Sequence, residues 1–329
     1  MKNILVTGGA GFIGSHVAKH LINKNNKVVI IDDLSGGFTE NIPDNVEFIE
    51  GSITDIKFIE NLFEKYKFSH IFHLAAYAAE GLSHFIKRFN YTNNLLGSVN
   101  LINESIKHKV ECFVFTSSIA VYGEGQLPMN ETLTPIPEDP YGIAKLAVEQ
   151  ELKVSKEMFD LNYIIFRPHN VYGEHQNIGD KYRNVVGIFM NQILKDMPLT
   201  IFGDGSQTRA FSYIDDVAPV IANSINNEKA KNQIFNIGAD QKYSVNELAI
   251  AIMTAMGKKV SINHLPARNE VLHAFSDHEK IHKYFNLPQA TSLNEGLERM
   301  AAWVKKHGAR STQSFKNIEI TENLPDSWK

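Results

Sequence analysis

The sequence has few of the features that mark secreted, membrane-spanning or nucleic-acid-binding proteins. Its 329 residues include a single cysteine, Cys112, which excludes an internal disulfide and favours a reducing compartment. No stretch approaches the ~20 consecutive apolar residues that a membrane-spanning helix needs. Charges of both signs are mixed, 33 Lys+Arg against 37 Asp+Glu, so no cationic surface for a phosphate backbone is expected. We therefore predict neither a nucleic-acid nor a membrane partner.

The start of the chain has no apolar signal region and no cleavage motif, because it passes at once into a strand-like run and a glycine cluster. We expect a cytoplasmic protein. Cys112 stands in the apolar run of residues 112–115 and is interpreted as a buried strand thiol with no chemical role.

Six short and almost continuously apolar segments predict buried parallel strands. They are residues 3–7, 27–31, 46–49, 70–74, 112–116 and 163–166. Helical patterns lie between them, as where apolar residues recur at three- and four-residue steps from Leu95 to Ile106. This alternation predicts an α/β fold in which helices cover both faces of a doubly wound parallel sheet.

The alternation of strands and helices becomes less regular after about Pro168. There, loops containing glycine and asparagine separate short strands from helices near Asp215, Ser244 and Leu293. We expect residues 1–170 to form the main domain and residues 171–329 to form mainly a smaller C-terminal α/β lobe. The alternative is that parts of the second segment are interleaved with the first domain. The polar residues from Gly308 onward predict an extended arm.

A glycine motif follows the first predicted strand and opens a helix, which is the context of a dinucleotide site. Gly8, Gly11 and Gly14 would let the backbone approach a pyrophosphate, with Phe12 and Ile13 at the helix start. Asp32 ends the second strand, where a carboxylate binds ribose hydroxyls and repels a 2′-phosphate, so NAD is favoured over NADP. The alternative is a structural turn with Asp32 capping a loop.

Three residues suggest alcohol oxidation. Tyr141 and Lys145 stand one helical turn apart on the same face, so the ammonium would favour the ionised phenol. Ser118, just past the fifth strand, can hydrogen-bond the same substrate oxygen. A phenol activated in this way is a general base.

Several segments together resemble the extended short-chain dehydrogenase/reductase family, and within it the NAD-dependent nucleotide-sugar epimerases, of which the UDP-glucose 4-epimerases look most similar. They are residues 7–14, 73–76, 118, 141–145 and 167–173. The resemblance implies a Rossmann-like sheet with a substrate-binding lobe, and it spans nearly the whole chain.

The resemblance also implies residue roles. Cofactor contacts fall on Leu74, Ala75, Ala76, Asn94 and Pro168, although Asn94 could be an ordinary polar residue in a helix. Asp55 would bind the adenine amino group or only cap a helix. Substrate contacts fall on Ser118, Asn170, Asn184, Phe202 near uracil, Arg209, and Arg268, for which a solvated surface position is the alternative.

The residues after Ser118 bear on the reaction. Related dehydratases place Asp-Glu there and related decarboxylases keep the Glu, whereas this chain has Ile119 and Ala120, which cannot move a proton. This favours NAD-dependent 4-epimerisation of a UDP-hexose through a transient 4-keto sugar. UDP-glucose/UDP-galactose is the first choice, and N-acetylated or uronate sugars stay open.

The alternatives are a nucleotide-sugar 4-dehydrogenase or 4-keto reductase, a 4,6-dehydratase, and a non-enzymatic NAD-binding sensor or scaffold. By resemblance, helices over residues 94–107 and 141–158 would form the contact of a homodimer. His70 and His73 point to opposite faces of a strand, so no metal site is expected.

Overall fold

A seven-stranded parallel sheet forms the centre of the computed structural model, which describes residues 2–268, 271–287, 289–312 and 314–328. The strand order is β11-β6-β5-β4-β1-β2-β3, and each neighbouring pair is parallel. The strands are β1 (Asn3–Thr7), β2 (Lys27–Asp32), β3 (Glu47–Glu50), β4 (His70–His73), β5 (Cys112–Thr116), β6 (Tyr163–Pro168) and β11 (Gln233–Ile237). The chain runs outward from β1 in both directions, which confirms the predicted doubly wound fold.

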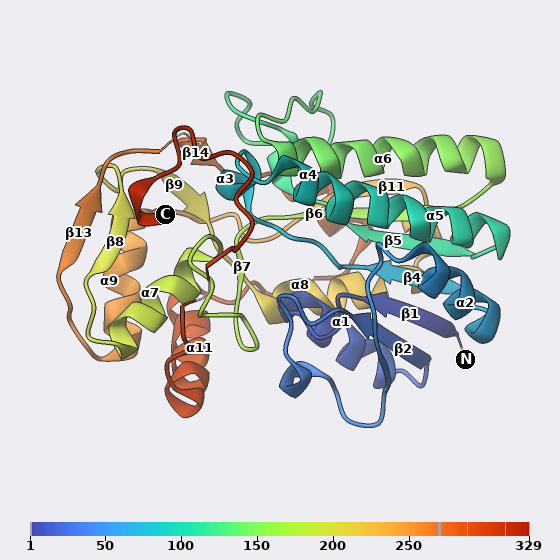
Figure 1. Ribbon diagram of the computed structural model, residues 1–329, viewed down its shortest axis with the longest axis horizontal. Coiled ribbons are helices and arrows are strands. Elements are labelled where there is room, and N and C mark those ends of the chain that lie inside the picture. The colour runs from blue at the N-terminus through green and yellow to red at the C-terminus, as the bar shows by residue number, and fades with distance from the viewer. Residues whose placement is uncertain (1, 269–270, 288, 313, 329) are drawn as a thin grey trace.

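Helices cover both faces of this sheet (Figure 1). On one face α1 (Phe12–Ile22) packs with α8 (Ile214–Asn223). On the other lie α2 (Ile56–Tyr66), α5 (Gly97–Lys107) and α6 (Pro140–Phe159). Strand residues alternate between the two apolar cores, with Ile4 and Val6 in the first and Leu5 in the second. Cys112 is fully buried in the first core, as predicted.

One predicted strand differs from expectation. Residues 46–49 were expected to be buried, but β3 is an edge strand in which Glu47 and Glu50 are exposed. A strand with one neighbour and incomplete helix cover can leave charged side chains in solvent, and charges there discourage pairing with another chain.

The smaller lobe is built from short strands and three longer helices. The predicted helices near residues 215, 244 and 293 are confirmed as α8, α9 (Val245–Met256) and α11 (Leu293–His307). Its strands are β7 (Val171–Tyr172), β8 (Leu199–Phe202), β9 (Thr208–Ala210), β10 (Ser212–Tyr213), β12 (Lys242–Ser244), β13 (Ile262–Leu265) and β14 (His273–Ala274). The other α-helices beyond β6 are α7 (Val185–Leu194) and α10 (Glu279–Tyr284).

Part of the chain beyond residue 170 returns to the main sheet, because α8 packs on α1 and β11 pairs with β6. The domain division at residue 170 stays a prediction. The short helices α3 (Glu80–Ser83) and α4 (Lys87–Tyr91) lie between β4 and α5. Within the described ranges, every helix is too short or too polar to cross a bilayer.

Helix starts follow local rules. Asp139 caps α6 by accepting a hydrogen bond from the Gly142 N–H at 2.9 Å, and Pro140 occupies the first helical turn. Ser244 and Glu247 form a capping box at the start of α9. The position of Tyr141 is therefore fixed by an unambiguous helix start.

Candidate active site

A cavity of about 750 Å³ opens at the carboxyl ends of β1 and β4, where the strand order reverses. Parallel α/β sheets bind ligands at this position. Every cofactor, catalytic and substrate residue predicted from the sequence lines the cavity except Asp55 and Asn94. The cavity therefore joins the cofactor half, the Tyr141 site and the smaller lobe into one chamber.

The glycine motif forms a tight cradle at one end. Gly8 has a φ of +69°, and a Cβ there would lie 2.7 Å from the Ala75 backbone. A Cβ on Gly14 would lie 2.0 Å from the Gly8 carbonyl oxygen. Gly11 precedes α1, and within the described ranges no side chain caps this helix start. The N–H groups of the first turn thus suit an anionic pyrophosphate.

Asp32 lies beside this cradle at the end of β2. Its carboxylate accepts hydrogen bonds from the Ala10 N–H at 3.1 Å and the Leu34 N–H at 2.8 Å. Burial raises the pKa of Asp32, and these backbone hydrogen bonds oppose the rise. The side chain links the glycine loop to the second strand and lines the cavity, which fits a group that binds a ribose.

Two predicted cofactor residues have structural partners. The exposed Asp55 caps α2 by accepting from the Phe58 N–H at 3.0 Å. Asn94 is buried, accepts from the Tyr77 N–H at 2.8 Å and donates to the Tyr77 carbonyl at 3.1 Å. Asn94 therefore holds the segment after β4 in place, and direct cofactor contacts by either residue stay predictions.

Ser118, Tyr141 and Lys145 meet at the centre of the cavity. Lys145 Nζ lies 5.8 Å from the centre of the Tyr141 ring and donates to the Thr116 carbonyl at 2.8 Å. Ser118 Oγ hydrogen-bonds the Tyr141 side chain and also accepts from the Ala120 N–H at 3.1 Å. The helical spacing of Tyr141 and Lys145 and the end of β5 bring the three together.

Burial shifts the pKa values of Lys145 and Tyr141. It lowers the pKa of Lys145 to about 7, against the opposing effect of Glu149. Burial also raises the pKa of the Tyr141 phenol, and nearby Glu80 adds to the rise, while the hydrogen bond with Ser118 lowers it. The protein alone holds Tyr141 protonated, so a further positive charge in the cavity would be needed to produce an effective base.

A buried ion pair between Arg167 and Glu149 lies one helical turn beyond Lys145. Arg167 Nε donates to Glu149 at 2.9 Å, and Ser117 Oγ donates to the same carboxylate at 2.6 Å. Glu149 follows Lys145 by one helical turn, so this network connects α6 to the ends of β5 and β6. Removing one partner would leave an uncompensated buried charge.

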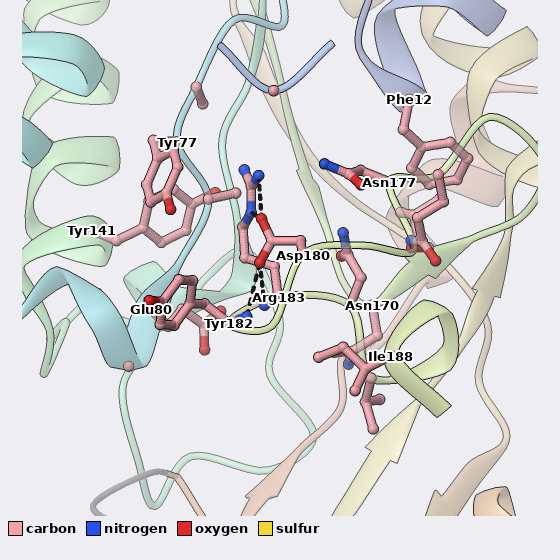
Figure 2. Close-up of a pocket in the computed structure, with 18 of the residues that line it drawn as sticks. Phe12, Tyr77, Glu80, Tyr141, Asn170, Asn177, Asp180, Tyr182, Arg183 and Ile188 are labelled. Carbon is pink, nitrogen blue, oxygen red and sulfur yellow. Dashed lines mark hydrogen bonds and ion pairs between the residues drawn. The ribbon is translucent and has the colours of Figure 1, made fainter. Parts of the chain in front are cut away.

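Four residues at the tyrosine end were missed by sequence reasoning (Figure 2). Arg183 Nε donates to Asp180 at 2.7 Å, and the guanidinium lies 4.5 Å from the centre of the Tyr77 ring. Tyr182 and Glu80 line the same region. Burial disfavours the charge of Arg183, but Asp180 outweighs it and raises its pKa. The Asp-x-x-Arg spacing before an apolar helix was the available signal.

The smaller lobe brings the predicted substrate residues to the other end of the cavity. Arg209 donates to the Thr208 and Leu272 carbonyls, both at 2.9 Å, so its charge is held without being neutralised by them. Asn170 donates to the Ala210 carbonyl at 3.1 Å, and Asn184 precedes α7. These side chains line the cavity beside Phe202 and Arg268.

Arg268 is half-buried and its guanidinium lies 4.6 Å from the centre of the Phe202 ring. This cation–π contact makes it part of the cavity wall rather than a solvated surface arginine. Glu270, two positions later, lies outside the described residues.

The described side chains include no cluster of metal-ligating groups. His73 instead hydrogen-bonds Thr7 Oγ1 at 2.7 Å and Ser98 Oγ at 2.8 Å, while His70 lies near Ser69 and Lys2. Each histidine is thus accounted for by local hydrogen bonds.

Comparisons with known proteins agree with this geometry. Residues 4–238 match the NAD dependent epimerase/dehydratase family. A putative UDP-glucose 4-epimerase of Methanocaldococcus jannaschii is 36% identical, over 92% of this chain and 99% of that one. The crystal structure of UDP-glucose 4-epimerase from Thermotoga maritima with UDP-glucose superposes with a TM-score of 0.88 at 36% identity, covering 93% of this chain and 99% of that chain.

The UDP-glucuronic acid 4-epimerase of Bacillus cereus, solved with UDP-glucuronic acid and NAD, superposes with a TM-score of 0.85 at 31% identity, covering 92% of this chain and 99% of that chain. The glycine cradle, Asp32 and the Tyr141 site fit NAD on the geometry given above. This chain is therefore an enzyme of the NAD-dependent epimerase/dehydratase family.

Proposed function

We propose that the chain is a UDP-hexose 4-epimerase. The observation that carries the proposal is the single cavity in which the NAD cradle, the Ser118–Tyr141–Lys145 group and a cationic nucleotide end are continuous. Relatives described as UDP-glucose 4-epimerases support the substrate class.

In this proposal Tyr141 Oη takes the proton of the sugar 4-hydroxyl and later returns it. The Lys145 ammonium favours the phenolate, and Ser118 Oγ hydrogen-bonds the same sugar oxygen. The glycine cradle and Asp32 would hold NAD+, which would supply a reversible acceptor for the C4 hydride, so that the 4-keto sugar could be reduced again on its opposite face. Because oxidation and reduction balance, no net NADH is formed.

The 4-keto sugar must rotate within the site. The binding affinity must therefore come from contacts to the rest of the substrate, the nucleoside diphosphate. Arg209 and Arg268 would bind the diphosphate and Asn170 and Asn184 would support it, with Phe202 beside the uracil. These contacts would hold the UDP while the sugar turns.

A neutral hexose is the preferred substrate. Glu80 beside Tyr141 puts a carboxylate near the sugar end that would repel a uronate, and Asp180 pairs with the Arg183 cation that would otherwise attract one. Elimination of water is disfavoured because Ile119 and Ala120 follow Ser118. UDP-glucose/UDP-galactose is thus proposed ahead of the N-acetylated and uronate sugars.

The test is incubation of purified protein with UDP-glucose, UDP-N-acetylglucosamine and UDP-glucuronic acid, followed by NMR analysis of the C4 configuration. We expect UDP-glucose to reach a mixture with UDP-galactose without added NAD and without net NADH. Stoichiometric NADH would indicate a 4-dehydrogenase, and loss of water would indicate a dehydratase. No conversion of any sugar, with NAD bound, would favour a sensor or scaffold.

We also propose a homodimer formed through α5 and α6. Exposed apolar side chains on α6 include Val154, Met158 and Phe159, at 51%, 68% and 60% exposure. Leu96, just before α5, is 56% exposed. Helices that present such a surface pack against a partner more favourably than against water. Light scattering is expected to give twice the chain mass, and Val154→Glu with Met158→Glu is expected to give a monomer.

A further inference from the structure

The C-terminal segment, described at residues 308–312 and 314–328, folds back from α11 across the body of the molecule instead of projecting from it (Figure 1). Arg310 forms an ion pair with Glu40, and its guanidinium lies 3.8 Å from the centre of the Phe38 ring, on the cofactor side. Asn191 of α7 donates to the Arg310 carbonyl at 3.1 Å and accepts from its N–H at 3.0 Å. The first part of the segment is thus bound to both halves of the enzyme.

The next stretch is attached beside the tyrosine end of the cavity. The Phe315 N–H donates to Tyr182 Oη at 3.0 Å, and the Phe315 ring lies 5.5 Å from that of Tyr77. The Glu319 carboxylate accepts hydrogen bonds from the backbone N–H groups of Arg88 and Phe89 in α4, at 2.8 and 2.9 Å. These contacts hold the segment along the cavity as far as its last turn.

Trp328 ends this path inside the wall of the cavity. Its side chain is buried, and its ring lies 5.3 Å from Tyr182 and 6.4 Å from Phe202. The Arg268 guanidinium lies 4.6 Å from Phe202 and 5.7 Å from Trp328. Two aromatic rings therefore contact one guanidinium and fix its position in the cavity wall.

We propose that Trp328 is a positioning residue of the nucleotide site: its indole holds Arg268 against Phe202 and forms one wall of the space taken by the nucleotide. This inference rests on the proposed function, which places a nucleoside diphosphate at Arg268. The family match ends at residue 238 and does not include this segment. The contact is therefore a feature added by the far end of the chain.

The first test uses the two tryptophans of the chain as probes. Trp303 lies in α11 and is absent from the described cavity lining, so NAD-loaded Trp303→Phe reports on Trp328 alone. Titration with UDP is expected to give a saturable change in tryptophan emission, because the ligand alters the surroundings of the indole. The change is expected to disappear in Trp328→Phe.

The second test measures affinity by calorimetry with UDP on the NAD-loaded protein. Trp328→Ala is expected to weaken UDP binding about tenfold, the value of one well-placed cation–π contact with its packing. Trp328→Phe should recover most of the loss, because it keeps an aromatic face. With the nucleotide sugar, the loss is expected in KM rather than in kcat, and Trp303→Phe should match the wild type.

The results separate the inference from the proposed function. Normal UDP binding by the wild type with unchanged affinity in Trp328→Ala, or with no emission change in Trp303→Phe, overturns the role of Trp328 alone. UDP that fails to bind even the wild type overturns the proposed function and this inference with it. A loss in Trp328→Ala that Trp328→Phe does not relieve overturns the aromatic mechanism.

Discussion

The two halves of the cavity are built in different ways. The cofactor half is formed by backbone at the ends of consecutive strands, with Gly8, Gly14 and Asp32 close together in the sequence. The substrate half is formed by side chains from segments far apart, with Arg183 supplied by a loop, Arg209 by β9 and Trp328 by the C-terminal segment. The first half is thus specified by local geometry and the second by the packing of the whole chain.

In the proposed mechanism the reaction takes place where the two halves meet, so the largest effect is expected there. Tyr141→Phe removes the proton acceptor and keeps the ring, so kcat should fall about a thousandfold while NAD binding is retained. Steady-state kinetics and calorimetry with NAD measure the two quantities. Activity within tenfold of the wild type would remove Tyr141 from the mechanism.

In the cofactor half, the glycine cradle of Gly8 and Gly14 should not tolerate an added Cβ. In Gly14→Ala the new Cβ would lie 2.0 Å from the Gly8 carbonyl oxygen, so the free energy of unfolding should fall by about 3 kcal/mol. Gly36→Ala is the control, because its Cβ would meet Arg183 Nη2 at an ordinary 3.5 Å. Equal melting temperatures for the two variants would show that the cradle is not tightly packed.

Lys145 gives a pH-dependent comparison in the cofactor-free protein. Its folded pKa of about 7 lies below the ~10.4 of an unfolded lysine, so between these values only the unfolded chain keeps the proton. Wild-type stability should therefore rise with pH relative to Lys145→Met, by about 2 kcal/mol from pH 7 to 9.

Denaturant unfolding at several pH values measures this difference. Lys153→Met, at a half-exposed position on the same helix, is the control for the loss of a lysine side chain from α6. A constant offset for Lys145→Met would mean that Lys145 keeps its charge when buried.

The substrate half should lose affinity rather than rate. Arg209→Lys keeps the charge but loses the planar donors, so KM should rise about tenfold with little change in kcat. Arg299→Lys, on the exposed surface of α11, is the control. A fall in kcat at unchanged KM would place Arg209 at the reacting carbon instead of the diphosphate.

The difference between local geometry and long-range packing also explains which parts of the structure could be predicted from the sequence. Strand positions, the glycine loop and the Tyr141–Lys145 spacing follow from periodicity and helix geometry, which act over a few residues. The exposure of β3 could not be predicted, because it depends on which strands lie at the sheet edge. Arg183, Asp180 and Glu80 were missed because isolated polar residues in a loop or in the four-residue helix α3 have no periodicity that marks a site.

By itself, the sequence determined the alternating strands and helices, the glycine cradle and the one-turn spacing of Tyr141 and Lys145, because short-range steric and hydrogen-bonding rules act on neighbouring residues. Only the tertiary structure decided which distant loops form the substrate half, and that the C-terminal segment brings Trp328 to Arg268. Contacts between residues sixty or more positions apart depend on the packing of the whole chain, which local patterns do not contain.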